Sequence, residues 1–75
     1  MKSIKIALKF TQDVKDFVNI VSKYTYDIDL KGDKYVVDAK SILGIYSLDL
    51  SKPITVEIHN DKCEALLKEL NKFAV

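Results

Sequence analysis

Apolar and polar residues alternate along four short stretches of the chain. In the first stretch, Ile4, Ile6 and Leu8 are separated by Lys5 and Ala7. A period of two is typical of a strand that has one buried face. The same alternation recurs over residues 26–30, 35–39 and 54–58. The pattern therefore predicts four strands, each with one apolar face.

A helical period separates the first two strands. Apolar residues recur at i, i+3, i+4 and i+7, at Val14, Phe17, Val18 and Val21. This spacing places them on one face of a helix. Thr11 or Asp13 is the expected N-cap of this helix, because short polar side chains accept hydrogen bonds from free backbone N–H groups.

A second helical stripe follows the fourth strand. Its apolar members are Cys63, Leu66, Leu67, Leu70 and Phe73. Asp61, followed three residues later by Glu64, resembles a capping box and predicts the start of the helix.

The segment at mid-chain predicts a short third helix with Ser41 as its N-cap. Gly44 lowers helix propensity by about 1 kcal/mol relative to alanine, so packing or a close backbone approach must hold this turn. Ile42, Leu43 and Tyr46 add more apolar surface than a short helix on a sheet can bury. Clustered exposed apolar side chains indicate a partner surface.

The predicted order of elements is β-α-β-β-α-β-α, in an α+β fold with two layers. A tight turn at residues 31–34, with Gly32 supplying a positive φ, joins the second and third strands into a hairpin. One helix layer covers the apolar face of the sheet. The other face is expected to be exposed to solvent. Its polar residues are Lys5, Asp27, Asp29, Thr55, Glu57 and His59.

Composition narrows the classes of protein further. The chain has 75 residues, which predicts a single domain over residues 1–75, and a net charge of +1. A net charge this close to zero gives no strongly basic surface that would favour binding to nucleic acid. No apolar run is long enough for membrane insertion. The chain has one cysteine and no signal-peptide pattern. We expect a cytoplasmic protein.

The mid-chain segment also resembles a known family. Lys40-Ser41-Ile42-Leu43-Gly44-Ile45, followed by Ser47-Leu48, is similar to the regulatory-serine segment of HPr. HPr is the histidine-containing phosphocarrier protein of the bacterial sugar phosphotransferase system. Ser22-Lys23-Tyr24 and Asp27-Ile28-Asp29-Leu30 resemble that family at a consistent spacing. The resemblance spans roughly residues 3–70 and implies four antiparallel strands with three helices on one side, an open-faced sandwich.

The phosphocarrier site of that family is missing from the sequence. The resemblance places Phe10 at the position of the acceptor histidine, Gln12 at that of an arginine and Asp13 at that of a proline. A phenyl ring has no nitrogen to accept phosphate, and Gln12 lacks the charged fork of arginine. We interpret Phe10 and Asp13 as the edge of the core and an N-cap. No catalytic residue is predicted, and the chain is similar in this respect to the catabolite-repression HPr homologue.

Other candidate groups favour structural roles. His59 is the only histidine, and its alternative role is an unusual phospho-acceptor. One histidine with Cys63 does not make a metal site, which takes three or four ligands. Asp27 and Asp29 share a strand face, where such residues are usually solubility groups. We expect neither a metal nor a cofactor.

The first functional hypothesis is a regulatory or protein-binding module that does not carry phosphate. A protein partner, or a second copy of the chain, would bind residues 41–48 through Ile42, Leu43 and Tyr46. Ser41 is a candidate for regulatory phosphorylation, with Lys40 as a charge partner and Asp38 opposing it. The alternatives are a phosphocarrier with another acceptor, and a structural domain that has lost both phosphorylation sites.

Overall fold

Four antiparallel strands form one sheet in the computed structural model, which describes residues 1–75. The strands lie in the order β1-β4-β2-β3, so the first and last strands of the chain are neighbours. Their bounds are Lys2–Ile6 for β1, Ile28–Lys31 for β2, Val36–Asp38 for β3 and Ile54–Ile58 for β4. β3 and β4 lie within the stretches that alternation predicts, whereas β1 begins two residues before its stretch and β2 ends one residue after its own.

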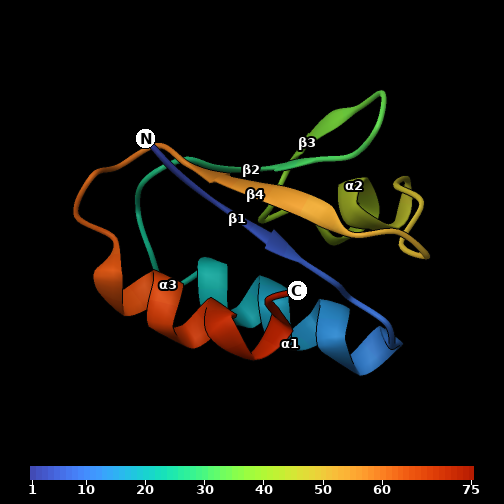
Figure 1. Cartoon of the computed structure of the whole chain (residues 1–75), viewed down its shortest axis with the longest axis horizontal. Coiled ribbons are helices and arrows are strands. Elements are labelled where there is room, and N and C mark those ends of the chain that lie inside the picture. Colours follow the sequence, from blue (N-terminus) through green and yellow to red (C-terminus); the bar gives the residue numbers. More distant parts are fainter.

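Three α-helices complete the α+β sandwich, as the sequence predicts. They are α1 (Thr11–Val21), α2 (Ile42–Tyr46) and α3 (Glu64–Leu70). Figure 1 shows α1 and α3 lying together along one face of the sheet, with α2 near β3, while the opposite face carries no helix. A 3₁₀ turn, η1 (Asn71–Phe73), extends α3 and was not predicted. None of the helices has the length and apolar composition that crossing a bilayer requires.

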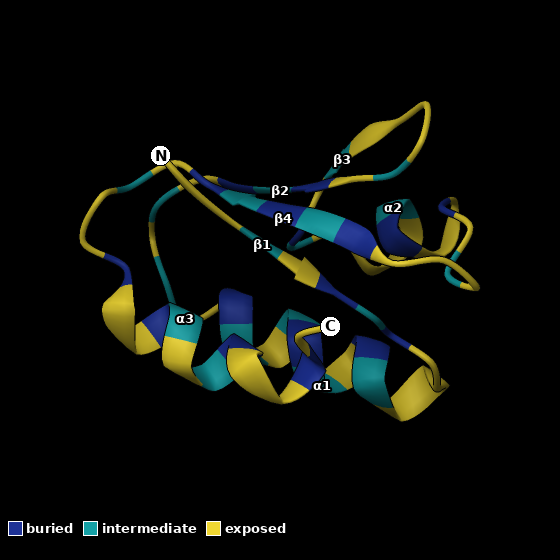
Figure 2. Ribbon diagram, in the orientation of Figure 1, coloured by how far each residue is buried: buried dark blue, intermediate teal, exposed yellow.

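The core lies between the sheet and the helices. All of its buried side chains are apolar, and no polar or charged side chain is buried. Figure 2 shows buried residues along β2 and β4 and at intervals along α1 and α3. The helical stripe of α1 contributes Val14, Phe17 and Val21, whereas Val18 is half-buried. The 3.6-residue period therefore predicts the inner face of this helix correctly.

The hairpin of β2 and β3 differs from its expected form. Gly32 does not have a positive φ, although its N–H donates to the Tyr35 carbonyl at 2.9 Å. A Cβ atom on Gly32 would lie 3.1 Å from Cδ2 of Leu48. A close approach to the core, not a left-handed conformation, therefore accounts for this glycine. The second strand also begins at Ile28, and Tyr26 lies in the preceding bend.

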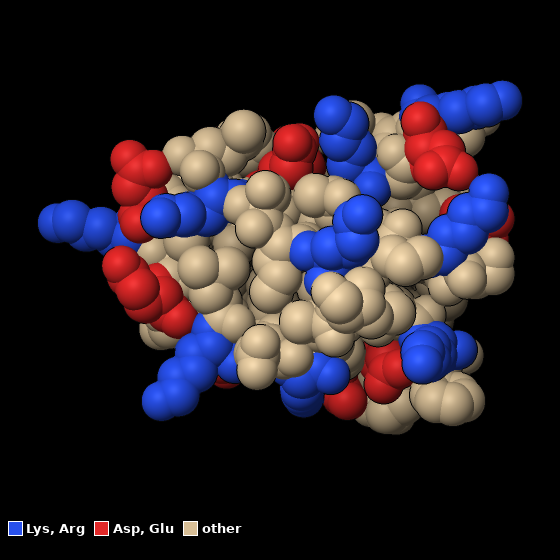
Figure 3. All heavy atoms as spheres, in the orientation of Figure 1, with Lys and Arg blue, Asp and Glu red and all other residues tan.

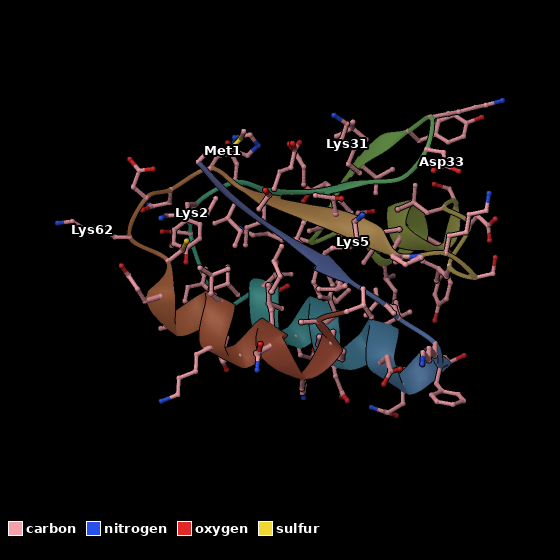
Figure 4. The ribbon with its side chains drawn as sticks, viewed as in Figure 1. Met1, Lys2, Lys5, Lys31, Asp33 and Lys62 are labelled. Carbon is pink, nitrogen blue, oxygen red and sulfur yellow. The ribbon has the colours of Figure 1, made fainter.

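The capping box predicted at the start of α3 is not formed. Cys63 is the N-cap residue and makes no side-chain capping bond, so Asp61 and Glu64 do not form a capping box. Asp61 instead accepts a 2.7 Å bond from the ammonium group of Met1. This bond lowers the pKa of the Asp61 carboxyl group. Met1 and Lys62, the neighbour of Asp61, lie at the same end of the molecule (Figure 4).

The last residues of the chain pair with the outer edge of β1. The Ala7 N–H donates to the Phe73 carbonyl at 2.9 Å, and the Val75 N–H donates to the Lys5 carbonyl at 3.2 Å. Ile6 lies opposite Ala74 in an isolated antiparallel bridge. One of the two edges of the sheet is thereby partly covered.

Candidate functional site

The first candidate segment is the start of α1, where the sequence analysis places the phosphocarrier position. Phe10 is the N-cap residue, with extended φ and ψ of −124° and 155°, and its side chain makes no capping bond. The ring is 69% exposed. Our interpretation of Phe10 as the edge of the core is therefore wrong. The phenyl ring points into solvent because the adjoining Leu8 and Val14 occupy the core.

Asp13 holds the start of α1 in place. Its Oδ2 atom accepts bonds of 3.2 Å from the N–H groups of Lys9 and Phe10. Neither Thr11 nor Asp13 is the N-cap, because both lie inside the helix. The Asp13 carboxylate reaches back from the third helical position and puts negative charge where the free N–H groups are. Gln12 is engaged with Asp16 on the surface of the helix, through a 2.9 Å bond from Nε2 to Oδ1.

The second candidate segment is α2, with Ser41 as its N-cap. The Ser41 Oγ atom accepts from the Gly44 N–H at 3.2 Å, which confirms the predicted cap. The Ser41 carbonyl accepts from the Ile45 N–H at 3.0 Å. At the other end, the Ser47 hydroxyl donates to the Gly44 carbonyl at 2.6 Å. Side-chain bonds at both ends thus stabilise a helix of only five residues.

Gly44 permits a close contact between α2 and β3. A Cβ atom at this position would lie 3.3 Å from the Cβ atom of Val37 and 3.3 Å from the Ser41 Oγ atom. The missing side chain at residue 44 therefore lets the backbone of α2 lie this close to β3 without displacing Val37 or Ser41. This contact is the close backbone approach that the sequence analysis expects in place of helix propensity.

Apolar side chains of α2 divide between the core and the surface. Ile45 is fully buried and anchors the helix. Ile42, Leu43 and Tyr46 are 36%, 81% and 46% exposed, respectively. We call these three residues the α2 patch. A five-residue helix can turn only one side to the sheet, so the remaining apolar groups face solvent.

Lys40 has a structural partner that the sequence analysis missed. Its Nζ atom donates to the carbonyl oxygens of Tyr24 at 2.7 Å and Tyr26 at 2.9 Å. It is therefore not free to pair with a phosphate on Ser41. Asp38, in contrast, stays close to the segment, because its Oδ1 atom accepts from the Lys40 N–H at 2.9 Å.

His59 lies on the open face of the sheet, away from the helix layer. Its Nε2 atom is 2.9 Å from the Oδ2 atom of Asp29 on the neighbouring strand. The two residues line a shallow hollow of about 440 Å³, together with Asp27, Asp38 and Lys40. No group of three or more His, Cys, Asp or Glu side chains has a geometry that could hold a metal ion. Cys63 is buried and forms no disulfide.

The two candidate segments belong to neighbouring helices. α1 and α2 contact each other, although Phe10 and Ser41 are far apart in the sequence. His59 and Asp29 lie apart from both segments, on the solvent-exposed face of the sheet that carries no helix. In the face drawn in Figure 3, lysines and acidic residues interleave without a large region of one sign. The feature of the α2 patch is three exposed apolar side chains on one short helix, not a concentration of charge.

The sequence analysis missed the exposure of Phe10, although the position of Asp13 could have predicted it. An acidic residue at the third helical position caps the helix by reaching back. The N-cap residue then needs no polar side chain, and an aromatic ring there is free to face solvent. The spacing of Phe10 and Asp13 carries this signal.

Comparisons with known proteins identify the family. The family described as "PTS HPr component phosphorylation site" matches residues 10–74 of the chain. The comparison with curated proteins gave no match. Several solved structures match the chain, and two of them share its fold along nearly the whole length.

The first is the crystal structure of HPr-C-His from Thermoanaerobacter tengcongensis. It has 30% sequence identity and a TM-score of 0.80, covering 96% of this chain and 89% of that one. The second is the phosphocarrier protein HPr from Bacillus anthracis str. Ames. It has 27% identity and a TM-score of 0.73, covering 99% of this chain and 94% of that one. The chain therefore belongs to the HPr family of the phosphotransferase system.

Proposed function

We propose that this member of the HPr family is a regulatory or protein-binding module that does not itself carry a phosphoryl group. HPr-family proteins act by contacting other proteins of the phosphotransferase system and are not catalytic enzymes. The observation that carries the proposal is the exposure of the α2 patch on a helix whose backbone is fixed at both ends. A rigid apolar surface binds a partner without first losing conformational freedom.

The start of α1 supports the second half of the proposal. Phe10 offers no atom that could form a bond to phosphorus. Asp13 engages the N–H groups of Lys9 and Phe10, and its negative charge would repel a phosphate placed there. Gln12 is neutral and bonded to Asp16. The three residues together oppose anion binding at this helix end.

The binding half is tested by titrating the isotope-labelled chain with purified proteins of the phosphotransferase system. We expect the backbone resonances of residues 41–48 to shift with at least one of them. Leu43→Asp should abolish the shifts, whereas Lys15→Asp on the exposed side of α1 should not. Binding that leaves residues 41–48 unperturbed would contradict the assignment of the patch. Absence of any binding would favour a structural domain.

The carrier half is tested with the first enzyme of the phosphotransferase system and labelled phosphoenolpyruvate. We expect no label on this protein. His59 is the one histidine that could accept it, and its ring is already paired with Asp29. Acid-labile label that disappears in His59→Ala would overturn this half and establish a phosphocarrier with a different acceptor.

We propose further that phosphorylation of Ser41 regulates the same surface. The exposed hydroxyl group already lies at the N-terminus of α2. A phosphate there adds a charge of about −1.5 to −2 next to free N–H groups and the α2 patch. Treatment with the serine kinase that modifies HPr in many Gram-positive bacteria should add one phosphate. No mass gain, or the same gain in Ser41→Ala, would leave Ser41 as a helix cap only.

A further inference from the structure

β3 forms an uncovered edge of the sheet. It is the outermost strand in the order β1-β4-β2-β3, whereas the edge of β1 is partly covered by the end of the chain. Figure 1 shows β3 at the rim of the molecule with no element beyond it. Val36, the first residue of β3, is 57% exposed, and the neighbouring Tyr35 is exposed as well. Apolar side chains on a free edge favour pairing with another strand.

The backbone of β3 presents its free groups at Val36. The Tyr35 carbonyl accepts from Gly32 and the Ala39 N–H donates to Ile28, both at 2.9 Å. Hydrogen-bonding residues alternate along an antiparallel strand, so Tyr35, Val37 and Ala39 face β2. The N–H and carbonyl groups of Val36 therefore point away from the sheet. The Asp38 carbonyl is already engaged with the Ser41 N–H, at 3.0 Å.

Carboxylates form a row across the open face that ends at this edge. Glu57 on β4 lies opposite Asp29 on β2, which lies opposite Asp38 on β3. Like charges on directly opposed strand positions repel one another. His59 pairs with Asp29, but no cation is bonded to the Asp38 carboxylate within the chain. A cation placed beyond the edge would complete the row.

The sequence around Val36 supplies that cation in a second copy. Lys34 lies two residues before Val36, and Asp38 lies two residues after it. Lys34 lies in the turn before β3 and Asp38 is the last residue of β3, so a two-fold axis through Val36 brings the turn of each chain, with its lysine, beside Asp38 of the other. Lys34 is exposed and makes no bond within the chain, so its side chain is available. Lys31, on the strand beside Val36, also rises on the face away from the helices (Figure 4).

We propose that two copies of the chain associate edge to edge through β3, antiparallel and in register at Val36. The two Val36 residues exchange both of their backbone hydrogen bonds across the axis. Two ion pairs between Lys34 and Asp38 flank them, and the two four-stranded sheets become one continuous sheet. The interface is isologous, because each copy contributes the same strand.

The proposed association has two expected properties. The dimer should be weak and readily reversible, because β3 is only three residues long. The dimer fraction should therefore depend on protein concentration. It should also weaken as salt is added, since the ion pairs lie at the surface. The α2 patch takes no part in the edge pairing, so the two surfaces can be tested separately.

Sedimentation equilibrium over a range of protein concentrations tests the proposal, with circular dichroism as a check of folding. We expect a monomer–dimer equilibrium for the wild type. Lys34→Asp sets two carboxylates against each other at both ends of the interface, and Asp38→Lys does the same with two cations. Each single variant should therefore be monomeric. An equal mixture of the two should form heterodimers, because both contacts are again of opposite sign.

The controls make each outcome decisive. Leu43→Asp should leave the association unchanged, and the double variant Lys34→Asp/Asp38→Lys should restore the homodimer. A wild-type monomer at every concentration would overturn the proposal, as would a dimer that Lys34→Asp does not weaken or that Leu43→Asp abolishes. If Asp38→Lys fails to fold, Asp38→Asn removes the charge and keeps the acceptor for the Lys40 N–H. Weaker association of that variant supports the proposal, and unchanged association overturns it.

Discussion

The Nζ atom of Lys40 lies 2.7 Å from the carbonyl oxygen of Tyr24, to which it donates a hydrogen bond. A second bond of 2.9 Å goes to the carbonyl of Tyr26. Tyr24 and Tyr26 lie in the connection between α1 and β2, and Lys40 lies between β3 and α2. One side chain therefore joins two connections that are distant in the sequence.

Replacing Lys40 with methionine should destabilise the protein. The Lys40→Met variant keeps most of the aliphatic stem but leaves two partly buried carbonyl groups without their donor. Hydrogen bonds to charged groups contribute about 1.5–3 kcal/mol, so we expect a loss of that order in urea unfolding. Lys15→Met, on the exposed side of α1, should change the free energy of unfolding by less than about 0.5 kcal/mol. Equal effects of the two variants would contradict the role of Lys40.

Two residues of α2 separate binding from folding. Leu43 is 81% exposed, so Leu43→Asp should change stability little while abolishing binding to the partner. Ile45 is fully buried, and Ile45→Ala should cost about 2–5 kcal/mol. Thermal unfolding and a partner titration of both variants check these outcomes. The interpretation fails if Leu43→Asp unfolds the protein.

The cap of α2 makes a measurable contribution. Ser41→Ala removes the acceptor of the Gly44 N–H and should destabilise the protein by about 1 kcal/mol. Ser41→Asp keeps an acceptor and adds favourable charge at the helix start, so it should retain most of the stability. Urea midpoints of the three proteins give the comparison. The same loss in both variants would exclude capping as the cause.

Tyr24 should contribute to the alkaline stability of the protein. Its hydroxyl donates to the Oε2 atom of Glu69 at 2.5 Å, and this bond raises the pKa of Tyr24 from 10.0 to about 12. A raised pKa in the folded state gives stability that is complete below pH 10 and is lost as the pH rises through about 12. The wild type should therefore lose more stability over this range than Tyr24→Phe. Near-ultraviolet titration of both proteins should assign the late-ionising tyrosine.

Ionised Glu69 should stabilise the protein at neutral pH, and this contribution to stability should be lost in acid. Hydrogen bonds from Lys23 and from Tyr24 lower the pKa of the Glu69 carboxyl group below 4.5. Its contribution is present above the unfolded value and disappears as the pH falls through the lowered folded value. Glu69→Gln should be less stable than the wild type at neutral pH, and the difference should narrow in acid. Unfolding midpoints measured across this range test the prediction, and a constant difference would contradict it.

Local patterns in the sequence predict the elements of this fold well. The alternation at Ile54, Val56 and Ile58 places three side chains in the core, and all three are buried. The 3.6-residue stripe of α1 and the cap at Ser41 are likewise local features, because every atom involved lies within one or two helical turns. Such patterns depend on neighbouring residues, which the sequence contains directly.

The errors concern contacts between distant residues. Asp61 has the spacing of a capping residue, but the ammonium group of Met1 binds it instead. Lys40 resembles a free charge beside Ser41, but it bonds to the loop that follows α1. Which partner a charged side chain selects depends on the folded arrangement, and no local spacing encodes that choice. The exposure of Phe10 has the same origin, since it depends on which neighbours fill the core.

The pairing of β1 with residues 73–75 has a consequence for the synthesis of the protein. β1 leaves the ribosome long before its two neighbours, β4 and residues 73–75, which are translated about 50 and 70 residues later. Contacts between residues so far apart in sequence slow folding. During most of translation β1 has exposed backbone groups on both sides and no strand to pair with. The sheet can therefore close around β1 only after β4 and the segment that ends at Val75 have emerged.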